Sequence, residues 1–314
     1  MINTSTPFFD WLMDMLRAIA EIRTPFLDKF MNIISMLGQE TIFMLFALVI
    51  FYCVSKREGY KYLFAFNFGV LINQFLKLFF RIPRPWIIDS DFEIVELARE
   101  GASGWSFPST HAMSAPMLYG GVAMQFKKRR HYIAAGIFVL LVAFSRMYLG
   151  VHTLLDVGVG LILGTLILIF SSKLFDKYGG SVTFINLALG ISTAFTLVLV
   201  IVSAASDSQA DAYAGSLKNA CALFGMAFGV FCGNLVERKF INFDTKSVWW
   251  VNIIKVGLGF GILLGLRAAL KPLFALITDS PFIDIARYAV IGFVSVGVYP
   301  ACFKLLNALS VKKS

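Results

Sequence analysis

Long apolar runs recur from about residue 41 to the end of the chain, and short polar segments separate them. Most of these runs have the length that an α-helix needs to cross the hydrocarbon core of a membrane. We therefore predict an all-α fold, a polytopic transmembrane helical bundle. About nine spans are expected, at residues 41–55, 60–80, 108–126, 131–149, 152–172, 182–204, 216–236, 249–268 and 285–308. The first run is short for a full crossing, so its helix is expected to begin upstream.

The first forty residues follow a different pattern. In segments 8–20 and 26–37, charged residues such as Asp14, Arg17 and Asp28 interrupt the apolar positions. This spacing is typical of amphipathic helices that lie in the membrane interface. We predict three parts: N-terminal interfacial helices over 1–40, a transmembrane core over 41–175, and additional transmembrane helices over 176–314. The last part carries no recognised motif and is expected to act as a scaffold, a lipid-tail contact or a dimer surface.

The composition supports a membrane protein. The chain has 314 residues, of which 58% are hydrophobic and 15% are charged, whereas a soluble domain carries about 25% charged residues. Basic clusters at 56–61, 127–130 and 238–246 fall on one side of a nine-span bundle, which predicts that this side is cytoplasmic. The net charge of +9 therefore belongs to loops rather than to a soluble basic domain, and nucleic-acid binding is not expected.

Three polar islands remain once the loop charges are assigned to membrane topology. Each lies where an apolar run begins or ends, and by the nine-span count all three lie at the extracytoplasmic ends of their helices. We therefore predict that they meet in space. The islands are KLFFRIPRP with Lys77 and Arg84, SFPSTHAMS with Ser109, Thr110 and His111, and SRMYLGVHTLLD with Ser145, Arg146, His152 and Asp156.

The residue types in these islands suit a phosphate ester. Lys77, Arg84 and Arg146 supply positive charge, and a guanidinium group binds two phosphate oxygens with its planar fork. Ser109 lies where a loop becomes a helix, and the free amide groups of a helix start attract anions. Ser109, Thr110 and Ser145 complete the predicted phosphate-binding set. Lys77 taken alone also fits a lysine that extends towards lipid headgroups.

The two histidines in the islands are expected to divide the chemistry. His152 and Asp156 are four residues apart, so on a helix they share one face. The carboxylate can accept a proton from one ring nitrogen, which leaves the other nitrogen as a nucleophile. His152 is predicted to attack phosphorus. His111 is predicted to protonate the departing alkoxide and then to take a proton from water.

Neither a metal nor another cofactor is expected. Two separated histidines and one aspartate beside several cations make a poor zinc site. The four cysteines have no metal-type spacing. A Gly-rich loop followed by Lys and Ser or Thr is absent from the sequence, which disfavours a nucleotide-driven pump.

At these residues the chain resembles the type 2 phosphatidic acid phosphatase family, whose soluble relatives include vanadium haloperoxidases. The family pattern is Lys-six residues-Arg-Pro, then Pro-Ser-Gly-His, then Ser-Arg-five residues-His-three residues-Asp, and residues 77–85, 108–111 and 145–156 follow it. The resemblance implies a helical-bundle catalytic core, a phosphohistidine on His152 and acid/base catalysis by His111. Thr110 stands where the pattern has glycine. The segment FPSTHAMS is similar to the sphingosine-1-phosphate phosphatase branch.

We therefore expect an integral membrane lipid phosphatase, a metal-independent phosphoric monoester hydrolase with its active site on the extracytoplasmic or lumenal side. The resemblance implies a bacterial plasma membrane as the expected location, with the endoplasmic reticulum as the alternative. A long-chain base phosphate such as sphingosine-1-phosphate is the first expected substrate. Phosphatidic acid, lysophosphatidic acid or a polyprenyl pyrophosphate is the alternative, and a phosphotransferase would use the same intermediate. From another class, a transporter could bind phosphate-bearing lipids without turnover. The expected partners are the lipid phosphate, membrane lipids and, in one alternative, a second copy of the chain.

Overall fold

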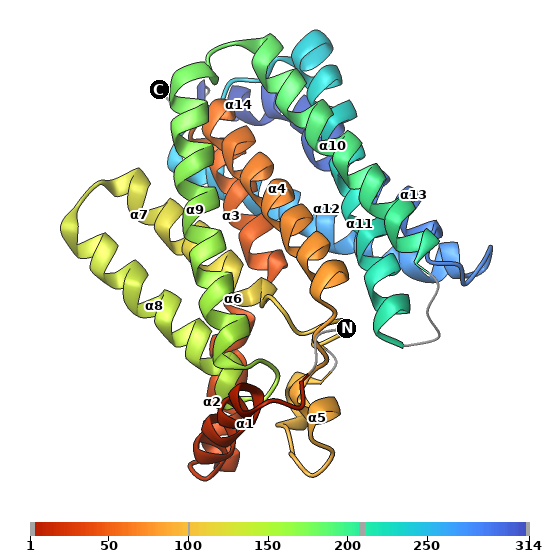
Figure 1. Cartoon of the computed structure of the whole chain (residues 1–314). Coiled ribbons are helices and arrows are strands. Elements are labelled where there is room, and N and C mark those ends of the chain that lie inside the picture. Colours follow the sequence, from red (N-terminus) through yellow and green to blue (C-terminus); the bar gives the residue numbers. More distant parts are fainter. Residues whose placement is uncertain (1–3, 100, 207–210, 312–314) are drawn as a thin grey trace. The chain divides into compact units, whose positions relative to one another are not determined.

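The structure is a computed structural model that describes residues 4–99, 101–206 and 211–311. Within those residues the chain forms helices joined by turns and loops, and no strand (Figure 1). This confirms the predicted all-α class. The predicted first and last parts also include residues 1–3 and 312–314, which lie outside the described residues. The elements are α1 Pro7–Ala20, α2 Pro25–Met36, α3 Glu40–Cys53, α4 Lys56–Phe80, α5 Pro85–Ile88, η1 Glu96–Ala98, α6 Thr110–Ala115, η2 Pro116–Gly120, α7 Gly121–Phe126, α8 Arg129–Tyr148, α9 Leu154–Tyr178, α10 Val182–Ala205, α11 Asp211–Val236, η3 Glu237–Ile241, α12 Trp249–Ala275, α13 Ile283–Phe293, η4 Val294–Val298, η5 Tyr299–Cys302 and α14 Phe303–Val311.

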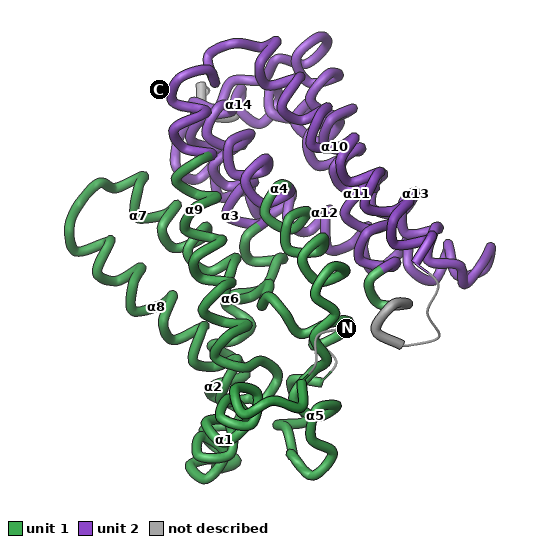
Figure 2. The backbone as a smooth tube through the Cα atoms, viewed as in Figure 1, with its two compact units in different colours: residues 1–43, 68–170, 210–216 green, residues 44–67, 171–209, 217–314 purple. Residues whose placement is uncertain are grey.

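The chain divides into two compact units (Figure 2). Unit 1 contains residues 1–43, 68–170 and 210–216, and unit 2 contains residues 44–67, 171–209 and 217–314. The boundaries fall inside α3, α4, α9 and α11, so these helices contribute residues to both units. The sequence-based division at residues 40 and 175 follows motif positions and stays a prediction.

The number of membrane spans differs from the predicted nine. Seven helical segments of the described chain are long and apolar enough to cross a membrane, and an eighth is possible if the bent pair α2 and α3 forms one span. The predicted span 41–55 is the 14-residue helix α3, and its axis makes a 41° angle with α2. The predicted span 108–126 is broken at η2, a π-helical turn that begins at Pro116. Proline has no amide hydrogen to donate, which explains why the regular helix is interrupted there.

The predicted N-terminal helices are present as α1 and α2. Thr24 precedes α2 and accepts a hydrogen bond from the amide of Leu27, and Pro25 occupies the first turn, where its missing amide hydrogen costs nothing. The inner face of α1 packs Phe9 and Leu12 against Ile82 and Phe107. These helices are therefore part of the core of unit 1. Their predicted position at a membrane interface stays a prediction.

Two glycines allow α9 to approach α6 closely within unit 1. A Cβ atom on Gly160 would lie 2.7 Å from the carbonyl oxygen of Ser109, and one on Gly164 would overlap the carbonyl of Met113. Only glycine fits at such backbone contacts. This packing brings the start of α6, with Ser109 and His111, next to the start of α9, with Asp156.

Unit 2 has a core of aromatic rings. Tyr52, Phe243, Tyr299 and Phe303 make edge-to-face contacts with ring centroids 5.0–5.5 Å apart, an arrangement that adds to the stabilisation from burial. Unit 2 also pairs its buried charged groups. The buried Glu237 lies 2.8 Å from the partly exposed Lys56, and the buried Asp284 lies 3.1 Å from Arg287.

Candidate active site

The three polar islands of the sequence come together in unit 1. Arg84 links the first island to the third, because its Nη1 donates to the carbonyl of Val151 at 3.0 Å and lies 3.0 Å from Nε2 of His152. The amide of Ser109 donates to the carbonyl of Asp156 at 3.0 Å, which links the second island to the third. Residues that are far apart in the chain are thus in direct contact, as the sequence predicted.

A serine lies between the predicted histidine and aspartate partners. Nδ1 of His152 is 3.6 Å from Oδ2 of Asp156, which is too long for a direct hydrogen bond. The Ser106 hydroxyl donates to that same Oδ2 at 2.6 Å and lies 3.3 Å from Nδ1. The amide of Thr153 donates to the carboxylate at 2.7 Å. His152 and Asp156 are neighbours, as predicted, but His152 lies in the loop before α9 and not on the helix, so the predicted helical pairing is wrong in its geometry. The spacing also did not reveal the intervening hydroxyl group.

Two of the three predicted cations hold the loop that precedes α6. Nζ of Lys77 donates to the carbonyl of Trp105 at 2.6 Å and to that of Ser106 at 3.3 Å. Arg84 donates through Nη2 to Ser103 at 2.8 Å and through Nε to Gly104 at 3.1 Å, in both cases to the carbonyl oxygen. Both side chains are buried. Their charges therefore face the site while their hydrogen bonds fix its loop.

Two nitrogen atoms of the Arg146 guanidinium group have no hydrogen-bond partner. Arg146 is only 3% exposed, and its Nη1 donates to the hydroxyl of Ser35 on α2. Its Nε and Nη2 are buried and have no hydrogen-bond partner. Leaving a charged donor buried and unpaired costs free energy. An arginine in this state is prepared to bind an anion through its planar fork.

The three predicted hydroxyl residues have partners within the protein. The Ser109 hydroxyl accepts a hydrogen bond from the amide of Ala112 and caps α6. Thr110 donates to Oδ1 of Asn73 at 3.0 Å, and Ser145 donates to the carbonyl of Val142 at 2.7 Å. Contact of these hydroxyls with phosphate stays a prediction.

His111 lies in the first turn of α6 and is partly exposed, whereas His152 is buried. Lys77, Arg84 and Arg146 act electrostatically on both imidazoles, which places the two rings within the field of one cationic cluster. His152 lies in the loop between the spans of α8 and α9. Burial, followed by the charges of Arg84 and Arg146, lowers the pKa of His152 well below its usual value. The ring is therefore neutral at pH 7 and keeps a lone pair.

Sequence reasoning missed three residues of the site. Ser106 connects His152 with Asp156, Ser35 contacts Arg146, and Asn73 donates to the carbonyl of Pro108 at 3.2 Å. Asn73 precedes Lys77 by one helical turn, so the shared face of α4 was a usable signal. For Ser35 the sequence offers none, because it lies in a separate helix more than a hundred residues from Arg146.

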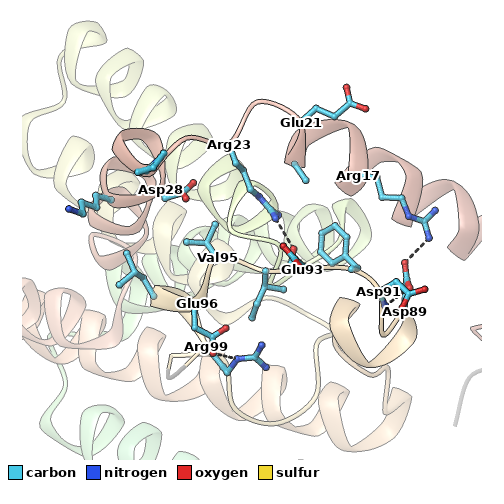
Figure 3. Close-up of a pocket in the computed structure, with 16 residues that line it drawn as sticks. Arg17, Glu21, Arg23, Asp28, Asp89, Asp91, Glu93, Val95, Glu96 and Arg99 are labelled. Carbon is cyan, nitrogen blue, oxygen red and sulfur yellow. Dashed lines mark hydrogen bonds and ion pairs between the residues drawn. The ribbon is translucent and has the colours of Figure 1, made fainter.

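A separate cavity of about 1580 Å³ lies between the turn that joins α1 to α2 and the segment 89–99 (Figure 3). Arg17 bridges it by an ion pair with Asp89 at 2.7 Å, and Arg23 donates to the carbonyl of Glu93 at 2.7 Å. The hydrogen bond from Arg17 holds the pKa of Asp89 below its usual value. All the predicted site residues are described in the structure, and none of them lines this cavity. Its walls carry charges of both signs, so it is not the cationic site.

Two family models match the chain. Residues 58–179 match the PAP2 superfamily, and residues 221–312 match the PAP2 superfamily phosphatase, transmembrane extension. The second match covers the part of the chain in which the sequence showed no motif.

Three relatives show the range of the family. Phosphatidylglycerophosphatase B of Bacillus subtilis is 33% identical over 51% of this chain and 81% of that protein. Sphingosine-1-phosphate phosphatase 2 of Homo sapiens is 26% identical over 53% of this chain and 40% of that protein. Undecaprenyl-diphosphatase BcrC of Bacillus subtilis is 33% identical over 34% of this chain and 54% of that protein. The match to the human relative thus spans less than half of its length.

The fold and the matches define an integral membrane phosphatase, a phosphoric monoester hydrolase. The chain belongs to the PAP2 superfamily.

Proposed function

We propose that the protein hydrolyses the phosphomonoester of a membrane lipid through a phosphohistidine on His152. The observation that carries this proposal is the orientation of the His152 ring, whose Nε2 faces the cationic cluster while Nδ1 faces Ser106 and Asp156. A nitrogen lone pair 3.0 Å from the buried Arg84, in a site that also holds the buried Lys77 and Arg146, suits nucleophilic attack on a phosphate group.

In the first step, Nε2 of His152 forms a bond to phosphorus as the bond from phosphorus to the ester oxygen breaks. His111 enters this step as the imidazolium, donates its extra proton to that oxygen and becomes neutral, and the lipid alcohol leaves. Arg146, with its two open donors, and Arg84 stabilise the charge on the equatorial oxygens.

In the second step, water attacks phosphorus and the bond between phosphorus and Nε2 breaks. His111, now neutral, accepts the proton of the attacking water. Inorganic phosphate leaves and His152 regains its lone pair. An alcohol in place of water would give transfer instead of hydrolysis, so both outcomes use the same residues.

The first candidate substrate is a long-chain base phosphate such as sphingosine-1-phosphate. The similarity of FPSTHAMS to that branch and the match to a sphingosine-1-phosphate phosphatase support it. Phosphatidylglycerophosphate is the second candidate, because the relative named for it is matched over the larger share of its length. Phosphatidic acid, lysophosphatidic acid and a polyprenyl pyrophosphate complete the panel. We place the site on the extracytoplasmic or lumenal side, and a bacterial plasma membrane is the favoured location.

The test is phosphate release by the purified protein in detergent from each lipid of this panel. Brief reaction with ³²P-labelled lipid and alkaline denaturation should trap a labelled phosphohistidine, which is absent in H152A. Vanadate should inhibit, and a chelator should leave the rate unchanged, because the proposed steps use no metal. Lipid binding without release from any lipid of the panel would support the transporter alternative and refute the proposal.

A further inference from the structure

Ser106 occupies a position that no motif of the family pattern includes. It lies three residues before Ser109, in the loop held by Lys77, and its side chain is fully buried at 0% exposure. Its hydroxyl contacts both the His152 ring and the Asp156 carboxylate. A buried hydroxyl with two such partners affects the chemistry of both.

The donors and acceptors of Asp156, Ser106 and His152 fix the direction of both hydrogen bonds that the Ser106 hydroxyl makes. An ionised carboxylate only accepts, so the single proton of the Ser106 hydroxyl goes to Asp156. The hydroxyl oxygen can then only accept from His152, which requires a proton on Nδ1.

The other side of the ring leads independently to the same conclusion. A guanidinium group only donates, so the Arg84 Nη1 that lies 3.0 Å from Nε2 requires a lone pair there. Both ring nitrogens therefore specify the tautomer with the proton on Nδ1, and this tautomer presents the nucleophilic lone pair at Nε2.

We propose that Ser106 is a positioning residue that connects Asp156 to His152. The carboxylate orients the nucleophile through this hydroxyl instead of by direct contact. Ser106 thereby fixes the ring rotation and the tautomer. This inference rests on the proposed function of His152 for its kinetic consequences, but the tautomer itself is measurable without turnover.

The kinetic test replaces Ser106 with alanine. We expect S106A to lower kcat about 10- to 100-fold, the usual effect of removing the group that orients a catalytic histidine. KM should stay within about twofold, because the hydroxyl faces the side of the ring away from the reacting nitrogen. S106T keeps the hydroxyl and should recover part of the rate. S114A is the matched control, because Ser114 is also buried in unit 1 and its hydroxyl has no hydrogen-bond partner.

A double-mutant cycle separates positioning from a structural role. If Asp156 acts through Ser106, then S106A in a D156N background should cause less than about a threefold further loss, because the pathway is already broken. Independent roles would instead multiply the two losses. Size-exclusion chromatography of each variant reports whether it folds. Full activity in S106A, or multiplying losses in the cycle, would overturn the proposal.

A spectroscopic test does not depend on the proposed function. The chain has three histidines, so ¹⁵N-histidine labelling gives few signals, and the H152A spectrum assigns those of His152. The ring should show a protonated Nδ1 and an unprotonated Nε2 in the absence of substrate. The opposite tautomer would refute the role of Ser106. The expected tautomer in a protein that releases no phosphate from any lipid would refute the proposed function alone.

Discussion

The two units treat buried charge in opposite ways. In unit 2, Lys56 and Arg287 are paired with Glu237 and Asp284 at salt-bridge distance. In unit 1, Lys77, Arg84 and Arg146 are buried, and within the described part of the chain none of the three forms a salt bridge.

We interpret this difference as one between charges that serve the fold and charges that fit the proposed phosphate site. A buried charge with a partner can serve the fold, whereas unneutralised buried cations cost free energy that an anionic ligand can return. Lys255 in unit 2 is a partial exception, because its buried Nζ has no hydrogen-bond partner and lies 4.9 Å from the ring centroid of Phe303. One lysine over an aromatic ring is stabilised by the ring face. Lys77, Arg84 and Arg146 share the site with one carboxylate, Asp156, so an excess of positive charge is left that an anionic ligand can balance.

The largest loss of activity is expected when His111 of unit 1 is replaced, and this variant tests the proposed proton transfer. We expect H111A to slow release from a lipid phosphate by about 10²- to 10⁴-fold, the usual contribution of a general acid. The loss should be much smaller with p-nitrophenyl phosphate, because p-nitrophenolate leaves without a proton. H131A, at a position next to the basic loop, is the control. Equal losses with both substrates would contradict the acid role.

Replacement of Arg146 tests the claim that its open donors await phosphate. We expect R146K to lower kcat/KM about 100-fold, because an ammonium group keeps the charge but not the planar fork. Vanadate inhibition should weaken in parallel. R129K, at the exposed first residue of α8, should behave like the parent. A full retention of activity in R146K would show that charge alone is needed.

The variant S35A tests whether α2 contributes to the site through the hydrogen bond that Ser35 accepts from Arg146. Loss of a hydrogen bond to a charged group costs about 1.5 kcal/mol, which corresponds to about a tenfold loss in kcat/KM. S171A is the control, because Ser171 is buried and its hydroxyl has no hydrogen-bond partner. An unchanged kcat/KM would confine α2 to a packing role.

Stability should depend on pH through His152 in the ligand-free protein. The folded-state pKa of this histidine is depressed, so between pH 6.5 and that lower value the unfolded chain binds a proton that the folded protein does not. Stability should therefore fall as the pH drops below 6.5, by at most about 1.4 kcal/mol per pH unit for this one group. The apparent Tm of the parent should fall more steeply than that of H152A. Parallel curves would contradict this assignment.

The smallest effect on turnover is expected from the paired charges of unit 2. K56M leaves Glu237 buried without its lysine and should destabilise the protein by about 2 kcal/mol, less than for a fully buried pair because Lys56 is partly exposed. The kcat of the folded fraction should stay unchanged. K56M/E237Q should recover part of the lost stability. A drop in kcat at full folding would show that the contrast between the units is wrong.

Much of the site was predictable because its residues carry chemistry that an apolar chain does not need. Charged and polar side chains are costly in free energy next to apolar membrane segments, and this singled out Lys77, Arg84, Arg146, His152 and Asp156. Their convergence was predicted because all of them lie at helix ends on the same side of the membrane. The hydroxyl of Ser106 was not predictable, because serine is common in loops and costs little anywhere. Its role appears only from the distances to two partners.

The span count shows where periodicity fails. Hydropathy predicted a full helix over 108–126, but it does not register the π-helical turn at Pro116. It also does not reveal that α1 packs Leu12 into the core of unit 1, since an amphipathic helix has an apolar face in either environment. The packing of Gly160 against Ser109 could not be predicted either, because hydrophobic periodicity does not reveal which backbones approach each other closely.

The contact between Arg84 and Nε2 of His152 means that, in the resting protein, a guanidinium group covers the lone pair of the proposed nucleophile. A reagent that reaches this nitrogen must first draw the guanidinium away. A neutral electrophile offers the displaced guanidinium no anionic acceptor. A phosphoryl group offers its oxygens to these donors and at the same time presents phosphorus to the ring. Arg84 would thus favour phosphate esters over neutral electrophiles at the same nitrogen at which it is proposed to assist the reaction.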